Sequence, residues 1–225
     1  YNDIIDRNID AQVARTQTRP IPAGEVSVRQ AVVFMLVQCF AGLAVLLQFN
    51  TYAVMVGCAS LGLVAVYPFM KRITYWPQAW LGLTFNWGAL MGWAAVQGGI
   101  GWPALLLYAG GLCWTLGYDT IYAHQDKEDD ALVGVKSTAL ALGEGTVRAI
   151  VLFYGLFIFA LLGAGTLANL GEIYYIGIAL AATHLGVQVK RIDIGNPDIC
   201  LSVFRSNISF GWIVFFSLIA GQLAS

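Results

Sequence analysis

The chain has 225 residues, of which 58% are hydrophobic and 11% are charged, and its mean hydropathy is +0.70. A soluble domain carries about 25% charged residues, so this composition indicates a membrane protein. The net charge of −1 and the sequence pI of about 6.1 give no sign of a nucleic-acid-binding protein, which would need a strongly basic surface.

Apolar segments long enough to cross a bilayer follow one another almost without pause. We predict seven spans, at residues 31–49, 52–70, 79–96, 103–122, 149–167, 173–189 and 208–223. Residues 1–12 look like the polar end of an eighth span, and we interpret the chain as a fragment without its N-terminal portion. The predicted fold class is therefore all-α, a polytopic membrane helical bundle that forms a single domain over residues 1–225.

Charged residues are divided unequally between the two sides of this predicted topology. All twelve Lys and Arg fall in the loops 1–30, 71–78, 123–148 and 190–207, which alternation places on one side. The opposite loops, 50–51, 97–102 and 168–172, contain none. Because positive charge stays on the cytoplasmic side, we expect the first side to face the cytoplasm, or the matrix in a mitochondrion.

The first acidic cluster lies at the start of the chain, in the pattern Asn2-Asp3-x-x-Asp6-x-x-x-Asp10. In a helix this spacing places the four side chains within an arc of about 100°. Carboxylates at the edge of a bilayer are costly unless they bind or pair with a cation, so a functional role is expected.

The second acidic cluster has the pattern Asp119-x-x-Tyr122-x-x-x-Asp126-x-x-x-Asp130. If the segment is one continuous helix, its three aspartates fall within about 40° of each other. Both clusters lie on the same predicted side. Two carboxylate faces opposed across a cavity would suit Mg²⁺, which completes its shell with water and substrate phosphates.

Basic residues follow each cluster: Arg15 and Arg19 come after the first, and Lys136 after the second. Arg offers paired donors to phosphate oxygens and Lys a compact charge, so we interpret these residues as diphosphate ligands. Lys71 and Arg72 are weaker candidates, because a cytoplasmic loop needs basic residues for topology alone.

Several other polar and aromatic residues have two interpretations. His124 fits a polar interfacial position better than a metal ligand, since its neighbours in sequence offer oxygen. Asn86 and Asn207 could contact an acceptor, although hydrogen bonding between helices is commoner. The aromatic residues beside the second cluster could anchor the helix at the interface or face a developing carbocation: Trp114, Tyr118 and Tyr122.

Together the two motifs resemble those of the UbiA superfamily of intramembrane prenyltransferases. The resemblance rests on both Asp patterns in order, on Arg15-Thr-x-x-Arg19-Pro20, and on Gly134-Val-Lys136-Ser137. The sequence around Asp119 is most similar to that of 4-hydroxybenzoate polyprenyltransferases. The resemblance covers the whole chain, but the family has nine spans, and the first span and most of the second have no counterpart here.

The resemblance implies a helical bundle whose central cavity opens to the cytoplasmic side and to lipid. It implies Mg²⁺ and two substrates, a polyprenyl diphosphate and 4-hydroxybenzoate, in ubiquinone biosynthesis at a bacterial plasma membrane or a mitochondrial inner membrane. The expected metal and diphosphate ligands are Asn2, Asp6, Asp10, Asp119, Asp126 and Asp130, with Asp3 less certain. Asp6, Asp10, Asp126 and Asp130 are the expected catalytic carboxylates, and Arg15, Arg19, Lys71, Arg72 and Lys136 the expected diphosphate-binding residues.

Other functions remain as alternatives. The same fold and reaction could serve a naphthoate, a homogentisate, or a haem or chlorophyll precursor. A CDP-alcohol phosphotransferase would need an Asp-x-x-Asp-Gly-x-x-Ala-Arg run, which the chain lacks. A cation-coupled transporter would carry ionisable residues near the middle of its spans, whereas these carboxylates gather at one edge.

Overall fold

The structure is a computed structural model that describes residues 1–14 and 16–225. Its described residues form helices and no strand, as the sequence predicts. In chain order the helices are α1 (Asn2–Asp10), α2 (Val28–Leu46), α3 (Thr51–Ile73), α4 (Pro77–Phe85), α5 (Trp87–Gln97), α6 (Trp102–Ala123), α7 (Lys127–Val133), α8 (Thr138–Leu142), the 3-10 helix η1 (Gly143–Gly145), α9 (Thr146–Leu167), α10 (Glu172–Arg191) and α11 (Pro197–Leu223).

Several of the long helices have the length and composition of membrane spans. Among the described residues, four stretches could cross a bilayer on those grounds: Val28–Leu46, Thr51–Ile73, Thr138–Leu167 and Pro197–Leu223. All seven predicted ranges coincide with helices, but the predicted span 79–96 is broken at Asn86 into α4 and α5. The predicted loop 190–207 was also wrong, because α10 continues to Arg191 and α11 already begins at Pro197.

The start of α11 follows ordinary helix chemistry. Asn196 is the N-cap, and its side-chain oxygen accepts the backbone N–H groups of Asp198 and Ile199. Pro197 occupies the first helical position, where a missing N–H costs nothing. Helix α11 therefore begins about ten residues before the predicted apolar span at 208–223.

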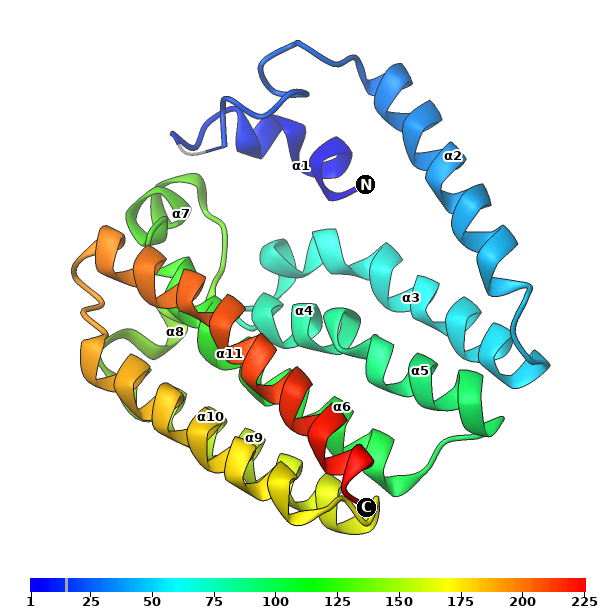
Figure 1. Ribbon diagram of the computed structural model, residues 1–225. Coiled ribbons are helices and arrows are strands. Elements are labelled where there is room, and N and C mark those ends of the chain that lie inside the picture. Colours follow the sequence, from blue (N-terminus) through cyan, green and yellow to red (C-terminus); the bar gives the residue numbers. More distant parts are fainter. Residues whose placement is uncertain (15) are drawn as a thin grey trace.

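The core of the molecule lies between α6, α9, α10 and α11, which run side by side (Figure 1). It is built from buried side chains such as Ile121, Tyr154, Phe157 and Phe210. Glycine lets α6 approach α9 closely: a Cβ atom at Gly117 would overlap the ring of Tyr154. Such close backbone approach is typical of helix packing in membranes, where there is no strong hydrophobic drive between helices.

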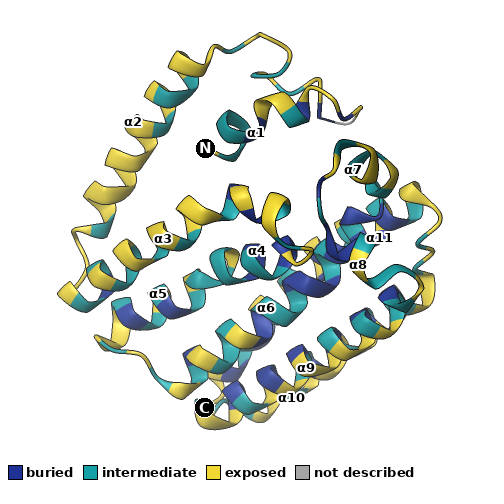
Figure 2. Ribbon diagram, turned by 180° about the vertical axis from the view of Figure 1, so that it is seen from behind, coloured by how far each residue is buried: buried dark blue, intermediate teal, exposed yellow. Residues whose placement is uncertain are grey.

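Helices α1 and α2 lie outside this core. Helix α2 has no buried residue, and in Figure 2 it carries only the colours of exposed and intermediate residues. Helix α1 lies near the C-terminal end of α3, and α7 lies at the same end of the bundle (Figure 1). This end of the bundle therefore gathers α1, the end of α3 and the beginning of α4, together with the segment that follows α6.

Candidate functional site

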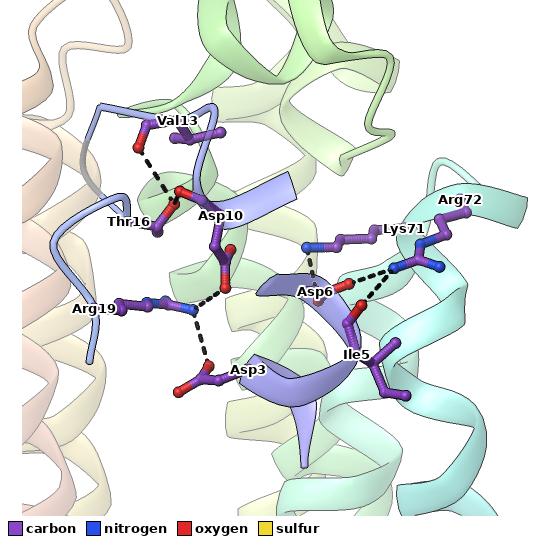
Figure 3. A network of polar contacts seen from close by, with 9 residues as sticks. All are labelled: Asp3, Ile5, Asp6, Asp10, Val13, Thr16, Arg19, Lys71 and Arg72. Atoms are coloured by element: carbon purple, nitrogen blue, oxygen red, sulfur yellow. Dashed lines mark hydrogen bonds and ion pairs between the residues drawn. The ribbon is translucent and has the colours of Figure 1, made fainter. Parts of the chain in front are cut away.

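The first aspartate motif forms helix α1, which is the condition under which its spacing places the side chains on one face, and the two buried residues of that helix are Asp6 and Asp10. The fully buried Asp6 carboxylate forms ion pairs with Lys71 Nζ at 2.8 Å and with Arg72 Nη2 at 2.9 Å (Figure 3). Arg72 also donates to the carbonyl of Ile5 at 3.2 Å. Two cations at the C-terminal end of α3 thus neutralise Asp6 and attach α1 to α3.

Arg19 connects the remaining carboxylates of the first motif. Its Nη1 atom lies 3.0 Å from Asp3 Oδ1 and 3.0 Å from Asp10 Oδ2 (Figure 3). The Thr16 hydroxyl donates to the backbone carbonyl of Asp10 at 2.9 Å and holds the turn that carries Arg19. Burial raises the pKa of the Asp10 carboxyl, and the positive charges of Arg19 and Lys71 oppose that shift.

The second aspartate motif does not form one continuous helix, so the predicted common helical face was wrong. Asp119 lies on α6, which ends at Ala123. Asp126 is the N-cap residue of α7, and Asp130 lies within α7. The turn between the two helices changes the direction of the chain, so the fold, rather than helical periodicity, brings these aspartates together.

A pocket of about 220 Å³ joins the two motifs. Its lining includes Asn2 and Asp10 from α1 and Asp119, Asp126 and Asp130 from the second motif. Three of the expected diphosphate-binding cations also line it: Arg19, Lys71 and Lys136. Asp6 and Arg72 are not part of this lining, and Asp6 reaches it through its ion pair with Lys71. Arg15 lies outside the described residues.

The segment around Lys136 is tied to the end of α3. Its backbone N–H donates to the carbonyl of Lys71 at 2.8 Å, and its Nζ donates to the carbonyl of Ile73 at 3.0 Å. The ammonium group also lies 5.3 Å from the ring centroid of Tyr75. Lys71 and Lys136, distant in sequence, are therefore neighbours in the pocket wall.

Sequence analysis missed two polar residues in the pocket lining, Tyr67 and Gln78, and it named a third, Ser137, only as part of the motif that ends the second cluster. Tyr67 lies one turn before Lys71 on α3, and Gln78 is the second residue of α4. A glutamine directly after a proline, at the start of an apolar segment, was the available signal for Gln78. Of the aromatic residues singled out, Tyr122 lines the pocket, and its ring packs 4.4 Å from that of Phe204.

The other polar residues have structural partners. His124 Nε2 lies 3.1 Å from Thr146 Oγ1, and burial, with the nearby Lys127, lowers the pKa of the imidazole to about 4. Asn86 donates to Thr115 Oγ1 at 2.9 Å, which joins the break between α4 and α5 to α6. These contacts agree with packing roles.

Asn207 also takes part in a hydrogen bond between helices. Its side-chain oxygen accepts the indole N–H of Trp114 at 2.9 Å, which joins α11 to α6. Trp114 itself stacks on Phe157 in the core rather than lining the pocket.

The donor set of the pocket suits a hard cation whose shell is incomplete on the protein side. Its oxygen ligands are the Asn2 amide and four carboxylates, those of Asp10, Asp119, Asp126 and Asp130. Within residues 1–14 and 16–225, no three His, Cys, Asp or Glu side chains lie close enough together to bind a metal ion by themselves. Mg²⁺ tolerates this arrangement, because it keeps several waters and takes further ligands from substrate phosphates.

The fold and this pocket define a polytopic helical membrane protein with an acidic site, lined also by cations, at one end of its bundle. Residues 1–219 match the model of the UbiA prenyltransferase family. The chain belongs to this family.

Curated relatives and a solved structure agree with that assignment. The 4-hydroxybenzoate polyprenyltransferase, mitochondrial, of Aedes aegypti is 47% identical over 223 residues, covering 99% of this chain and 51% of the relative. The Homo sapiens protein of the same name is 47% identical over 227 residues, covering 99% of this chain and 60% of the relative. The chain thus spans about half the length of the curated relatives it matches. The apo structure of a UbiA homolog from Aeropyrum pernix K1 superposes with a TM-score of 0.85 at 25% identity, covering 99% of this chain and 83% of that one.

Proposed function

We propose that the full-length protein carrying this chain transfers a polyprenyl group from polyprenyl diphosphate to the ring of 4-hydroxybenzoate, in ubiquinone biosynthesis and with Mg²⁺. The observation that carries the proposal is the pocket in which the two Asp motifs meet Arg19, Lys71 and Lys136. The names of the curated relatives support the choice of acceptor.

Oxygen ligands from both motifs would hold Mg²⁺ at this pocket. Those lining it are Asn2, Asp10, Asp119, Asp126 and Asp130. Asp6 could join them only if its carboxylate exchanged Lys71 or Arg72 for the metal. When bound, Mg²⁺ would supply positive charge that neutralises the diphosphate and makes it a better leaving group.

The protein's own cations would complete that neutralisation. Arg19, Lys71 and Lys136 would bind diphosphate oxygens while the allylic C–O bond breaks and its electron pair leaves with the diphosphate. The resulting allylic cation needs protection from water, which the surrounding apolar helices supply. The ring carbon ortho to the phenol hydroxyl then attacks, and a motif carboxylate takes the ring proton.

Residues 1–225 would act as one prenyltransferase domain in the membrane, with the prenyl tail extending into lipid. The Asp motifs would face the cytoplasm of a bacterium or the matrix of a mitochondrion, consistent with the distribution of Lys and Arg. In either case the membrane is an inner one, a bacterial plasma membrane or a mitochondrial inner membrane.

The proposal is tested in membranes that contain the full-length protein. Labelled 4-hydroxybenzoate and a polyprenyl diphosphate are supplied with Mg²⁺ or with EDTA, alongside the variants Asp6→Ala and Asp126→Ala. We expect label in a lipid-soluble product only with Mg²⁺, and loss of that product in both variants.

Two other outcomes would change the conclusion. If the diphosphate is consumed with a different aromatic acceptor and not with hydroxybenzoate, the reaction type stands and the acceptor is wrong. If no aromatic acceptor is prenylated, the enzymatic function itself is refuted.

A further inference from the structure

Gln78 is a buried amide in the wall of the pocket that no part of the reaction described above uses. It is the second residue of α4, directly after Pro77, and only 7% of its surface is exposed. It nevertheless belongs to the pocket lining, together with Lys71 and Ser137. A polar side chain that is more than nine-tenths buried needs partners, because an unmade hydrogen bond in such a place is expensive.

One half of the Gln78 amide has a partner within the protein. Its Oε1 atom accepts the backbone N–H of Thr138 at 3.1 Å. Thr138 is itself fixed, since its hydroxyl lies 2.6 Å from that of Thr120 on α6. A backbone N–H can only donate, so the atom that faces it must be the amide oxygen. This contact sets the orientation of the whole planar amide.

The other half of the amide is left for a ligand. With Oε1 fixed on Thr138, the NH₂ group lies at the other terminus of the planar amide, and within residues 1–14 and 16–225 it donates no hydrogen bond to a protein atom. The group is therefore a donor whose direction is fixed before any ligand binds. Such preorganised donors lose little entropy on binding.

The charges around the pocket indicate what this donor binds. One wall supplies donors: Lys71 at the end of α3, Gln78 at the start of α4, and the Ser137 hydroxyl. The carboxylates of the lining come from α1 and from the second motif, and Arg19, which pairs with Asp10, is a further donor among them. A cation would lie against the carboxylates, so the position between the cation and the donor wall suits an anion.

We propose that the Gln78 amide nitrogen donates a hydrogen bond to an oxygen of the bound diphosphate group, and that Thr138 orients it for this purpose. The inference rests on the proposed function, because it presumes a diphosphate substrate. It adds a neutral, preoriented donor to the expected charged ones. Gln78 then contributes to diphosphate affinity and not to recognition of the aromatic acceptor.

Two variants of the full-length protein separate this role from a structural one. Gln78→Glu keeps an oxygen for the Thr138 N–H but removes the donor and adds negative charge. Gln78→Met removes both the donor and the acceptor at similar volume. Gln48→Glu, at an exposed glutamine after α2, is the matched control for the added charge. Binding of inorganic diphosphate with Mg²⁺ is measured directly, and KM is measured separately for the prenyl diphosphate and for 4-hydroxybenzoate.

We expect both Gln78 variants to weaken diphosphate binding by about tenfold or more, the usual effect of a lost hydrogen bond to a charged group. The KM for prenyl diphosphate should rise in parallel, while the KM for 4-hydroxybenzoate and the behaviour of Gln48→Glu stay unchanged. Diphosphate binding at the wild-type level in either Gln78 variant overturns the inference, as does a change confined to the KM for 4-hydroxybenzoate. The two possible failures are distinguishable. If the wild-type protein binds diphosphate and the Gln78 variants bind it equally well, only the inference about Gln78 fails, whereas if the wild-type protein binds no diphosphate, the proposed function fails as well.

Discussion

Three carboxylates of the first motif have a cationic partner inside the protein. Asp6 is paired with Lys71 and Arg72, and Arg19 bridges Asp3 and Asp10. Buried carboxylates without such partners would be strongly destabilising. The first motif is therefore neutralised by Arg19, Lys71 and Arg72, and the first two of these are also proposed as diphosphate ligands.

Replacement of Arg19 by Gln should impair the reaction through the diphosphate. The change removes a charge that lines the pocket and leaves Asp10, which is almost fully buried, without its ion pair. We expect the KM for prenyl diphosphate to rise by about tenfold or more, since a hydrogen bond between charged groups contributes about 1.5–3 kcal/mol. Steady-state kinetics in membranes measure this.

The control for this prediction is Arg29→Gln, at an exposed arginine near the start of α2. It removes the same charge away from the pocket and should leave KM unchanged. Equal effects of the two substitutions would mean that Arg19 acts only through the overall charge of this face.

For individual residues, the sequence indicated which acidic and basic side chains belong to the site, but not which of them pair with one another. The spacing of Asp6 and Asp10 indicated a functional helix face, and both residues are buried in the structure. The pairing of Asp6 with Arg72 joins residues 66 positions apart, which no local pattern can indicate. Gln78 was missed for the same reason, because its role depends on Thr138 and the fold between them.

At the scale of helices, close contact between α6 and α9 depends on small residues. Gly117→Ala would place a methyl group against the ring of Tyr154, which is itself buried and cannot move aside. We expect a loss of about 1–3 kcal/mol in the free energy of unfolding, the typical cost of overpacking. Thermal unfolding of the purified protein in lipid nanodiscs measures it as a lower midpoint.

Gly155→Ala on α9 is the matched comparison, because a Cβ atom there meets nothing within 4 Å. Since Ala favours helix by about 0.5–1 kcal/mol over Gly, this variant should be as stable as the parent or slightly more so. Unchanged stability of Gly117→Ala would show that α6 and α9 pack less tightly than described.

Hydropathy located the helices but not their breaks or ends. It merged α4 and α5, because Asn86 stands alone between two apolar stretches and its side chain is satisfied by Thr115 on another helix. It also began α11 too late, since the Asn196 cap and Pro197 precede the apolar part. The turn within the second motif, between Ala123 and Lys127, is not indicated by the spacing of the aspartates, which is equally compatible with one continuous helix.

At the scale of the molecule, the pocket balances charges from separate parts of the chain. Its described lining includes four carboxylates and three cationic side chains. Mg²⁺ alone is opposed by the cations, and diphosphate alone by the carboxylates. We therefore expect Mg²⁺ and diphosphate together to raise the unfolding midpoint far more than either one does. A ligand that binds the folded protein stabilises it, by about 2.7 kcal/mol when its concentration is about one hundred times Kd.

Thermal unfolding with Mg²⁺, inorganic diphosphate or both tests this expectation. Asp126→Ala should abolish the combined effect without lowering the midpoint of the ligand-free protein by a comparable amount. A full shift produced by diphosphate alone would contradict the proposed involvement of the carboxylates.

The burial pattern of α1 also has a consequence for how the protein responds to ionic strength. Its two buried residues are both aspartates, so ion pairs contribute to its attachment to the bundle beside the half-buried isoleucines of the same helix. Salt screens exposed charges over a Debye length of about 8 Å at 0.15 M and over shorter distances as its concentration rises, but it screens buried pairs much less. Concentrated salt should thus loosen the more exposed pair of Arg19 with Asp3, whereas the pairs of the fully buried Asp6 with Lys71 and Arg72 should keep α1 attached to α3.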